Sequence, residues 1–334
     1  MQGQKEHVMS LRKLQLFALS LALILPVTAC RNQSKNSKEA MTGDLIIFHA
    51  GSLSVPFKEI AGAFMRENPG VNVLLEPAGS VASARKITDL GRPCDILASS
   101  DYHVIDNMLI PRYATWNLRF AANEMVIAYT DRSRSRDLID SSSWYQILLK
   151  NDVIFGRADP NQDPCGYRTI FTIKLAQKYT GDTTPTARFL KKDISYMRPK
   201  EVDLMPLLET GTVDYIFIYR SVAEQHHVRY LLLPDEINLK NPAFNDLYAG
   251  VSTEILGERP GERVTVHGEA MVYGVTVLTQ APDHEAAMAF MQFLMDPGKG
   301  MAIMERNGQP SVVPSFCGQY NALPMSLKKY ARND

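Results

Sequence analysis

The sequence has little of what several large classes of protein require. It contains four cysteines in 334 residues, without a CxxC pair, so no zinc-binding spacing is visible. Lysine plus arginine and aspartate plus glutamate number 36 each, and a net charge of zero gives no basic surface for nucleic acid. The motifs G-x-S-x-G, P-loop and H-E-x-x-H are absent as well. We therefore expect a protein that is not an enzyme, carries no cofactor and binds no nucleic acid.

An apolar stretch near the start of the chain is too short to span a bilayer. Residues 14–25 are nearly all apolar, follow Arg12 and Lys13, and lead through small residues to Cys30. This order predicts a signal peptide over residues 1–29. A cysteine directly after Val-Thr-Ala resembles the lipobox of bacterial lipoproteins, in which that cysteine is acylated. We expect a lipid on Cys30 that anchors the protein to a bacterial membrane, in the periplasm or at the outer face of the cytoplasmic membrane. The alternative is an ordinary secretory signal cut nearby.

A polar segment separates this leader from the rest of the chain. Residues 31–43 are rich in Lys, Ser and Asn without periodicity, and with Cys30 they predict a flexible tether over residues 30–43. The chain as a whole has 45% hydrophobic and 22% charged residues, as in an ordinary globular protein. If Cys30 carries lipid, at most one disulfide can form among the three remaining cysteines, which are Cys94, Cys165 and Cys317.

From residue 45 onward, short apolar runs and helical patterns alternate. The predicted order is strand 45–48, a helix opened by Pro56, strand 71–75, helix 81–90 and strand 95–98. This alternation of strands and helices predicts a parallel sheet with covering helices. In such sheets, ligands bind beyond the carboxyl ends of the strands.

Two further segments predict a second lobe. Residues 120–129 are typical of a strand that crosses into it, and residues 271–279 of a strand that returns. An amphipathic helix over residues 283–295 is expected to pack back onto the first lobe. Two crossings would let the lobes close over a ligand as a hinge.

The turn before residue 164 combines an anion site with a carboxylate. A strand predicted over residues 153–155 leads to Asp163, at the position of a helix N-cap, and to Pro164, at the first helical position. Unpaired backbone N–H groups at a helix start attract anions. A carboxylate there would repel a simple anion, but it would suit an anion whose Lewis-acidic metal centre accepts a further oxygen ligand.

Three more polar residues stand at strand ends or helix starts. Ser52 and Ser80 each occupy a Gly-Ser turn beyond a predicted strand, where they could be simple N-caps or could share an oxyanion site. Glu201 lies in the first turn of a predicted helix, where it could merely complement the helix dipole. The residues by themselves leave both interpretations open.

Four segments, in consistent order, resemble the tungstate/molybdate-binding proteins of ABC uptake systems. They are Phe48–Ser54, Asp159–Arg168, Arg198–Glu201 and Asp214–Ala223. The resemblance implies an α/β periplasmic-binding-protein fold of type II, with two lobes that are each a mainly parallel sheet with covering helices. Two crossover strands would join the lobes. Lobe I would comprise residues 44–122 and 270–334, lobe II residues 123–269, and the ligand would bind in the cleft between them.

The resemblance implies that two carboxylates complete a six-coordinate metal centre. Asp163 and Glu201 would be ligands to the tungsten or molybdenum of the bound oxyanion. Sulfate and phosphate have no accessible metal centre, so these carboxylates would repel them while accepting tungstate.

The resemblance also implies the hydrogen-bond donors to the oxo groups. These are the hydroxyl and backbone groups of Ser52 and Ser80, the phenol of Tyr219, and the N–H of Cys165, since Pro164 has none. The complete set of expected ligand-binding residues is Gly51, Ser52, Ser80, Asp163, Pro164, Cys165, Glu201 and Tyr219.

We therefore expect a monomeric solute-binding lipoprotein that captures tungstate or molybdate and delivers it to an ABC permease and its ATPase. One alternative is a binder of another oxyanion, such as sulfate or phosphate, for which Asp163→Ala would leave affinity intact. A second is a lipoprotein enzyme that uses Asp163 and Glu201 as an acid–base pair and turns over a substrate. A third is a purely sensory protein.

Overall fold

The computed structural model describes residues 41–181, 186–257 and 261–333. The predicted signal peptide, the lipidated Cys30 and nearly all of the predicted tether lie outside these residues. Within them, no helix is both long enough and apolar enough to cross a membrane.

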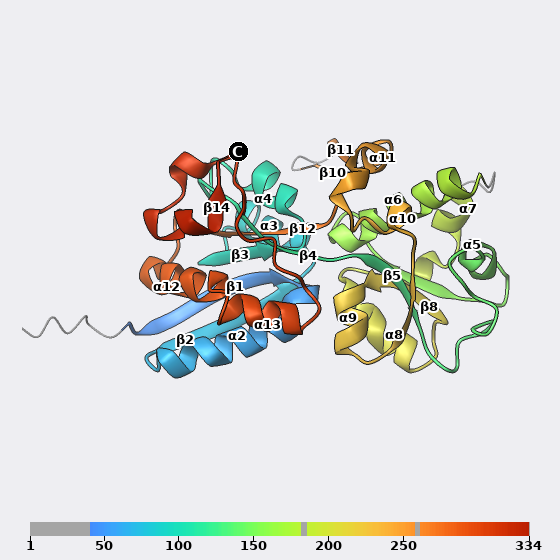
Figure 1. The fold of residues 1–334 in the computed structure, drawn as a ribbon, viewed down its shortest axis with the longest axis horizontal. Coiled ribbons are helices and arrows are strands. Elements are labelled where there is room, and N and C mark those ends of the chain that lie inside the picture. Colours follow the sequence, from blue (N-terminus) through green and yellow to red (C-terminus); the bar gives the residue numbers. More distant parts are fainter. Residues whose placement is uncertain (1–40, 182–185, 258–260, 334) are drawn as a thin grey trace, which may run out of the picture. The chain divides into compact units, whose positions relative to one another are not determined.

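A five-stranded sheet organises lobe I (Figure 1). Its strand order is β2-β1-β3-β12-β4, with β1 parallel to β2 and β3, and β12 antiparallel to β3 and β4. The strands span Gly43–Ala50 (β1), Val71–Ala78 (β2), Ile96–Ser99 (β3), Leu118–Ala122 (β4) and Val272–Val277 (β12).

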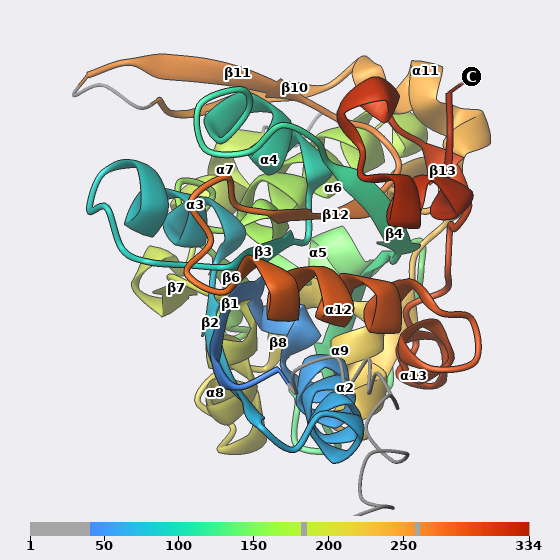
Figure 2. The ribbon, with the colours of Figure 1, turned by 90° about the vertical axis from the view of Figure 1, so that its left-hand side faces the viewer.

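Successive residues of β1 point to opposite sides of this sheet, and helices cover both sides. Phe48 joins the core formed with α3 and α4, whereas Ile47 joins the core formed with α2 and α12. The ring of Phe290 in α12 contacts Phe57 and Phe64 in α2, with centroid distances of 6.3 and 5.3 Å. The helix predicted over residues 283–295 therefore does pack onto lobe I, where α2, α12 and α13 lie together (Figure 2).

The helices and short terminal elements of lobe I complete this layer. They are the 3-10 helix Gly51–Leu53 (η1), Ser54–Glu67 (α2), Ser80–Thr88 (α3), Tyr102–Met108 (α4), His284–Met295 (α12), Gly300–Arg306 (α13), Ser315–Phe316 (β13), Tyr320–Ala322 (η5), Met325–Tyr330 (η6) and Ala331–Arg332 (β14).

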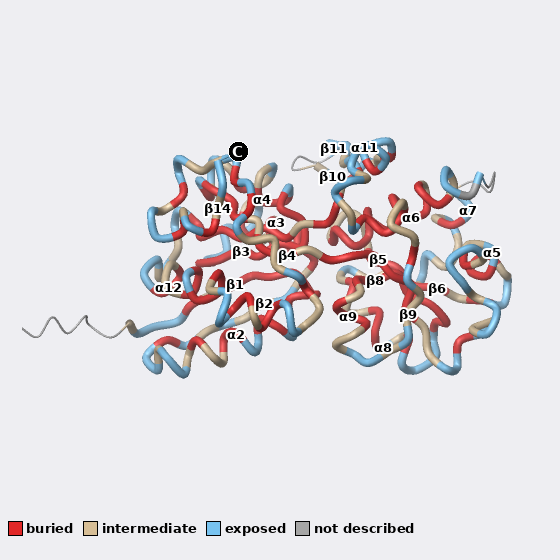
Figure 3. The backbone as a smooth tube through the Cα atoms, viewed as in Figure 1, coloured by how far each residue is buried: buried red, intermediate tan, exposed pale blue. Residues whose placement is uncertain are grey.

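A second five-stranded sheet organises lobe II, in the order β7-β6-β8-β5-β9. Here β6 is parallel to β7 and β8, and β5 is antiparallel to β8 and β9. Every residue of β3 in the first sheet and of β8 in the second is buried (Figure 3). The strands span Met125–Tyr129 (β5), Phe155–Ala158 (β6), Met197–Arg198 (β7), Tyr215–Tyr219 (β8) and Arg229–Leu232 (β9).

Helices and one hairpin surround the second sheet. They are Trp144–Leu148 (α5), Pro164–Thr180 (α6), Thr186–Lys191 (α7), Ile194–Tyr196 (η2), Glu201–Leu204 (η3), Met205–Glu209 (α8), Arg220–Gln225 (α9), Asp235–Asn238 (α10), Pro242–Phe244 (η4), Asn245–Ala249 (α11) and the antiparallel pair Ser252–Leu256 (β10) and Arg263–His267 (β11).

The chain passes between the two sheets twice. The segment predicted as one strand over residues 120–129 is two strands, β4 in the first sheet and β5 in the second, separated by Asn123 and Glu124. Asn123 fixes this junction, because its Nδ2 donates to Ser221 Oγ at 2.8 Å and to the hydroxyl oxygen of Tyr273 at 3.0 Å. The return passage leads from β11 into β12, which is part of the first sheet.

These findings confirm the two-lobe α/β fold and correct two details. The prediction of mainly parallel sheets is right for half of the strand pairs in each sheet, because β12 and β5 run antiparallel to their neighbours. The strand predicted over residues 153–155 is β6, residues 155–158, since Gly156 and buried Arg157 continue it. The exact lobe boundaries stay a prediction.

Candidate ligand-binding site

Asp163 is the N-cap of α6, as the sequence predicts, with Pro164 in the first turn. Its Oδ1 accepts a hydrogen bond from the Cys165 N–H at 2.8 Å, and its Oδ2 accepts one from the Glu201 N–H at 3.0 Å. The side chain is 1% exposed, and this burial raises the pKa of the carboxyl. Asp163 therefore joins the starts of α6 and η3.

Glu201 is a buried carboxyl beside that of Asp163. It begins η3 and is 1% exposed. Its oxygens make no well-aligned hydrogen bond among the described residues, and the Asp163 carboxyl and the Ser52 N–H are their hydrogen-bonding neighbours. A Cβ atom on Gly51 would lie 2.7 Å from Glu201 Oε2, so the carboxyl rests against the backbone of the opposite lobe. Burial, followed by the charge of Asp163, raises the pKa of Glu201 well above its ordinary value. The site thus brings together two adjacent carboxyls that both resist ionisation.

The two serines of the Gly-Ser turns are buried and are not helix N-caps. The N-cap positions belong to Ala50 and Gly79, and neither helix has a side-chain cap. Ser52 Oγ accepts a hydrogen bond from the Tyr273 hydroxyl at 2.9 Å, and Ser80 Oγ accepts one from the Ser100 N–H at 3.0 Å. The capping interpretation is therefore wrong. The proton of the Ser52 hydroxyl thereby stays available for a ligand, whereas Ser80 Oγ also lies 3.2 Å from Ser100 Oγ, a contact in which either hydroxyl can donate.

Tyr219, at the end of β8, is fully buried beside a cation. Its hydroxyl oxygen accepts a hydrogen bond from Arg168 Nη1 at 3.0 Å, and the hydroxyl donates a long hydrogen bond to Ser100 Oγ at 3.5 Å. The N–H of Cys165 donates to Asp163 in this structure, so its contact with a ligand stays a prediction. The described cysteines are buried free thiols, and the Cys165 thiol faces the Phe217 carbonyl oxygen at 3.7 Å.

The lobes touch around these residues. A Cβ atom on Gly79 would lie 2.4 Å from the Gln162 carbonyl oxygen and 3.0 Å from that of Pro199. The Ala82 N–H of lobe I also donates to Gln162 O at 3.1 Å. These backbone contacts place the start of α3 directly against the turns that carry Asp163 and Glu201. The structure is thus a closed arrangement of the two lobes.

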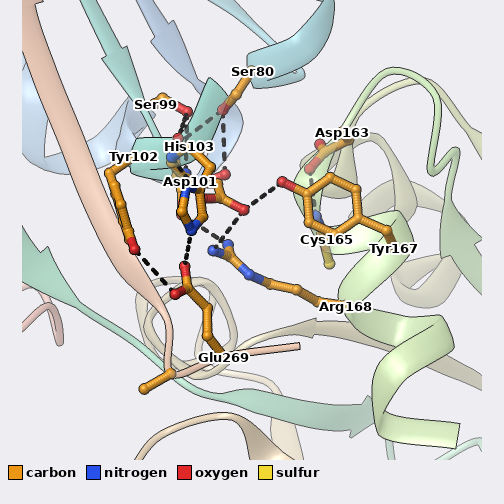
Figure 4. Close-up of polar contacts among 12 residues, drawn as sticks. Ser80, Ser99, Asp101, Tyr102, His103, Asp163, Cys165, Tyr167, Arg168 and Glu269 are labelled. Atoms are coloured by element: carbon orange, nitrogen blue, oxygen red, sulfur yellow. Dashed lines mark hydrogen bonds and ion pairs between the residues drawn. The ribbon is translucent and has the colours of Figure 1, made fainter. Parts of the chain in front are cut away.

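Sequence analysis missed a second layer of residues in this interface. Ser100 and Asp101 follow β3, while Tyr167 and Arg168 lie in α6, and Figure 4 shows Asp101, Tyr167 and Arg168 converging. The Tyr167 hydroxyl donates to Asp101 Oδ2 at 2.5 Å, and Arg168 Nη2 lies 3.3 Å from the same oxygen. The sequence did contain an indication: the third strand is predicted over residues 95–98, so the polar residues after it are expected at the same sheet edge as Ser52 and Ser80.

A second ionic cluster lies beside this layer (Figure 4). His103 Nε2 is 2.9 Å from Glu269 Oε1, and the Tyr102 hydroxyl donates to Glu269 Oε2 at 3.0 Å. Burial alone would lower the pKa of His103, but the hydrogen bond to Glu269 and the negative charges of Asp101, Glu269 and Asp106 outweigh it and raise that pKa. The pair therefore favours the protonated imidazole.

His103→Gln is expected to destabilise the protein at pH 6 but not at pH 9. Because the folded-state pKa is raised from 6.5, the stabilisation is fully present below about pH 6.5 and is lost as pH rises through the folded pKa. The His103 side chain is 46% exposed, so solvent screening limits the fall in Tm to about 2 °C. Thermal unfolding at both pH values tests this, with exposed His284→Gln as the control. Equal losses at both pH values would contradict it.

The carboxyl pair does not by itself make a site for a bare cation. Among the described residues, no group of three or more His, Cys, Asp and Glu side chains could hold a metal ion. Two carboxyls, two serine hydroxyls and a phenol instead suit a ligand that brings both a metal centre and its own oxygens.

This chain is similar to several known proteins over most of its length. The bacterial extracellular solute-binding protein family matches residues 45–309. An uncharacterized solute-binding protein of Petrotoga mobilis is 46% identical over 88% of this chain and 92% of its own. The molybdate/tungstate-binding protein WtpA of Pyrococcus abyssi is 40% identical over 95% of this chain and 98% of its own. The periplasmic molybdate-binding protein of Azotobacter vinelandii shares the fold, with a TM-score of 0.58 and 15% identity over 81% of this chain and 99% of its own.

Proposed function

This chain belongs to the family of bacterial extracellular solute-binding proteins, and from that premise we propose that its solute is tungstate or molybdate. The 40% identity to WtpA of Pyrococcus abyssi supports this choice. The protein would close its two lobes around the oxyanion and deliver it to an ABC permease and its ATPase. Binding and release, without chemical change of the solute, would be its whole activity.

The adjacent buried carboxyls of Asp163 and Glu201 carry this proposal. Two such carboxyls are costly to ionise side by side, and proteins retain such groups where a ligand will satisfy them. Sulfate offers no acceptor for a carboxylate oxygen. The tungsten of tungstate can accept two, so one oxygen each from Asp163 and Glu201 would raise its coordination from four oxygens to six.

The remaining residues would hold the four oxo groups. Ser52 and Ser80, whose oxygens already accept bonds from the protein, would donate their hydroxyl protons from lobe I. Tyr219 would donate its phenol from lobe II. Gly51 lets the Glu201 carboxyl approach the backbone, and the turn of Pro164 and Cys165 holds Asp163 at the start of α6.

The location and assembly of the protein complete the proposal. It would be lipid-anchored through Cys30, outside the cytoplasm, after removal of residues 1–29. It would act as a monomer that docks on its permease. Mass spectrometry of the protein from membranes tests this, since a diacylated Cys30 at the new N-terminus is expected and an unmodified or later N-terminus would refute it.

Calorimetric titration of the purified protein with tungstate, molybdate, sulfate and phosphate tests the proposed ligand. Tight one-to-one binding of the first two, with sulfate and phosphate at least about 100-fold weaker, is the expected result. X-ray absorption at the tungsten edge should then show six oxygen neighbours instead of four. A bound tungstate that remains four-coordinate would contradict the role of the carboxyls, and binding of sulfate or phosphate alone would contradict the ligand.

Chemical conversion of a bound substrate would favour the alternative of an enzyme that uses Asp163 and Glu201 as an acid–base pair. Tungstate recovered unchanged from the complex is expected. No heat with any of the four oxyanions would overturn the proposed function itself.

A further inference from the structure

Arg168 is a buried cation with partners in both lobes. It lies in the second turn of α6 and its side chain is 3% exposed. Its Nη1 donates to the Ser100 carbonyl oxygen at 2.7 Å and to the Tyr219 hydroxyl at 3.0 Å, and its Nη2 lies 3.3 Å from Asp101 Oδ2. Ser100 and Asp101 belong to lobe I, whereas Arg168 and Tyr219 belong to lobe II. These contacts to lobe I can exist only while the lobes are closed.

The two carboxylate oxygens of Asp101 make contacts in different lobes. Oδ1 accepts the His103 N–H at 3.0 Å and caps α4, so this oxygen serves the structure of lobe I. Oδ2 accepts the Tyr167 hydroxyl at 2.5 Å and pairs with Arg168, so this oxygen serves the opposite lobe. An asparagine could keep the cap but not the ionic contact, because its amide is neutral and still has an oxygen for the cap.

The contact between Arg168 and Tyr219 determines where the O–H bond of the Tyr219 phenol points. Because the hydroxyl oxygen accepts from the guanidinium, its proton points away from Arg168. A hydrogen bond from a cation also makes a hydroxyl a stronger donor. In this structure the Tyr219 proton is directed at Ser100 Oγ over a long 3.5 Å, and a bound oxo group would replace Ser100 as its acceptor.

The positive charge of Arg168 lies near the carboxyl pair, since Arg168 is in the second turn of the helix that Asp163 caps. A closed site with two carboxylates and a dianion needs such a nearby counter-charge.

We propose that Arg168 is a positioning residue of the ligand site: when the lobes close it pairs with Asp101 and fixes the Tyr219 phenol as a donor to the bound oxyanion. This inference rests on the proposed function. It adds that the ion pair prolongs the closed, loaded state and contributes little to the entry of the ligand.

Tungstate release from the purified protein tests the inference, followed as a chase of labelled tungstate with excess molybdate. Asp101→Asn should release tungstate at least about tenfold faster, because breaking a buried ion pair acts mainly on the dissociation rate. Its association rate and Tm should change little, since the N-cap remains. The matched control is Asp283→Asn, which removes the charge of another N-cap, that of α12.

A double-mutant cycle separates positioning from simple stabilisation. Asp101→Asn should accelerate release much less in Arg168→Met than in the wild type, because the contact between Asp101 and Arg168 is already lost there and only the Tyr167 hydrogen bond remains to be changed. Arg168→Lys, which keeps the charge but loses the fork of donors, should lie between wild type and Arg168→Met. Additive effects, or an unchanged release rate in Asp101→Asn, would overturn the inference.

The outcomes distinguish this inference from the function on which it rests. If wild type binds no tungstate, both fail. If wild type holds six-coordinate tungsten but Asp101→Asn releases it at the wild-type rate, only the positioning role fails.

Discussion

Glu201→Gln is expected to weaken tungstate binding by at least about 100-fold. Loss of a group that merely supports a metal ligand already lowers affinity about 10- to 100-fold, so loss of a ligand itself should reach at least the upper end. The glutamine keeps the size of the side chain and removes its charge, which isolates the coordination from the packing against Gly51. Calorimetric titration with tungstate measures the loss, and X-ray absorption should show fewer than six oxygen neighbours in any complex that forms.

Two further variants sharpen this prediction. Asp203→Asn removes a carboxylate from the same 3-10 helix η3, but that side chain is 42% exposed and pairs with Lys200, so affinity should stay within about twofold. Asp163→Asn retains an N-cap residue on α6 and should lose affinity as Glu201→Gln does. Full affinity and six-coordinate tungsten in Glu201→Gln would show that this carboxyl is not a ligand.

Gly79→Ala is expected to lower tungstate affinity about 10- to 100-fold while the protein stays folded. The added Cβ would lie 2.4 Å from the Gln162 carbonyl oxygen and 2.9 Å from its carbon, distances that force the lobes apart. Forced overpacking of this kind costs about 1–3 kcal/mol. Gly79 has φ −58° and ψ 141°, which alanine adopts without strain, so lobe I by itself should accept the change.

Small-angle scattering and thermal unfolding check this expectation. Saturating tungstate should shrink the radius of gyration of the wild type more than that of Gly79→Ala, with similar Tm values for the two unliganded proteins. The matched control is Gly62→Ala in α2, where the nearest atom to the new Cβ is Arg66 Nη1 at 3.8 Å. If Gly79→Ala contracts and binds tungstate as well as the wild type does, close contact between Gly79 and the Gln162 carbonyl group is not required for binding.

Local rules were sufficient to predict the start of α6. An N-cap aspartate followed by proline is a short-range pattern, and Asp163 caps α6 as expected. The order from β1 to β3 in lobe I also followed from apolar spacing, whereas the helices α4 and α13 were not predicted. The limits of β6 were missed because Gly156 and Arg157 do not resemble strand residues, and the neighbouring strands that bury them lie elsewhere in the sequence.

Contacts between distant segments could not be predicted from local patterns. Asp163 and Glu201 are 38 residues apart, and only the fold shows that the backbone of one donates to the side chain of the other. The serines were ambiguous for the same reason, since their partners Tyr273 and Ser100 lie in other elements. The resemblance, rather than spacing, suggested Glu201 as a ligand.

The buried carboxyl pair of Asp163 and Glu201 has a consequence for the empty protein. When the lobes close without a ligand, the Glu201 oxygens make no well-aligned hydrogen bond and face a second carboxyl. A poorly satisfied buried group costs about 1–3 kcal/mol, so the empty closed form would be roughly 5- to 150-fold rarer than with that group satisfied. Under the proposed function, a permease that binds the closed form would therefore rarely dock an empty protein and hydrolyse ATP without transport.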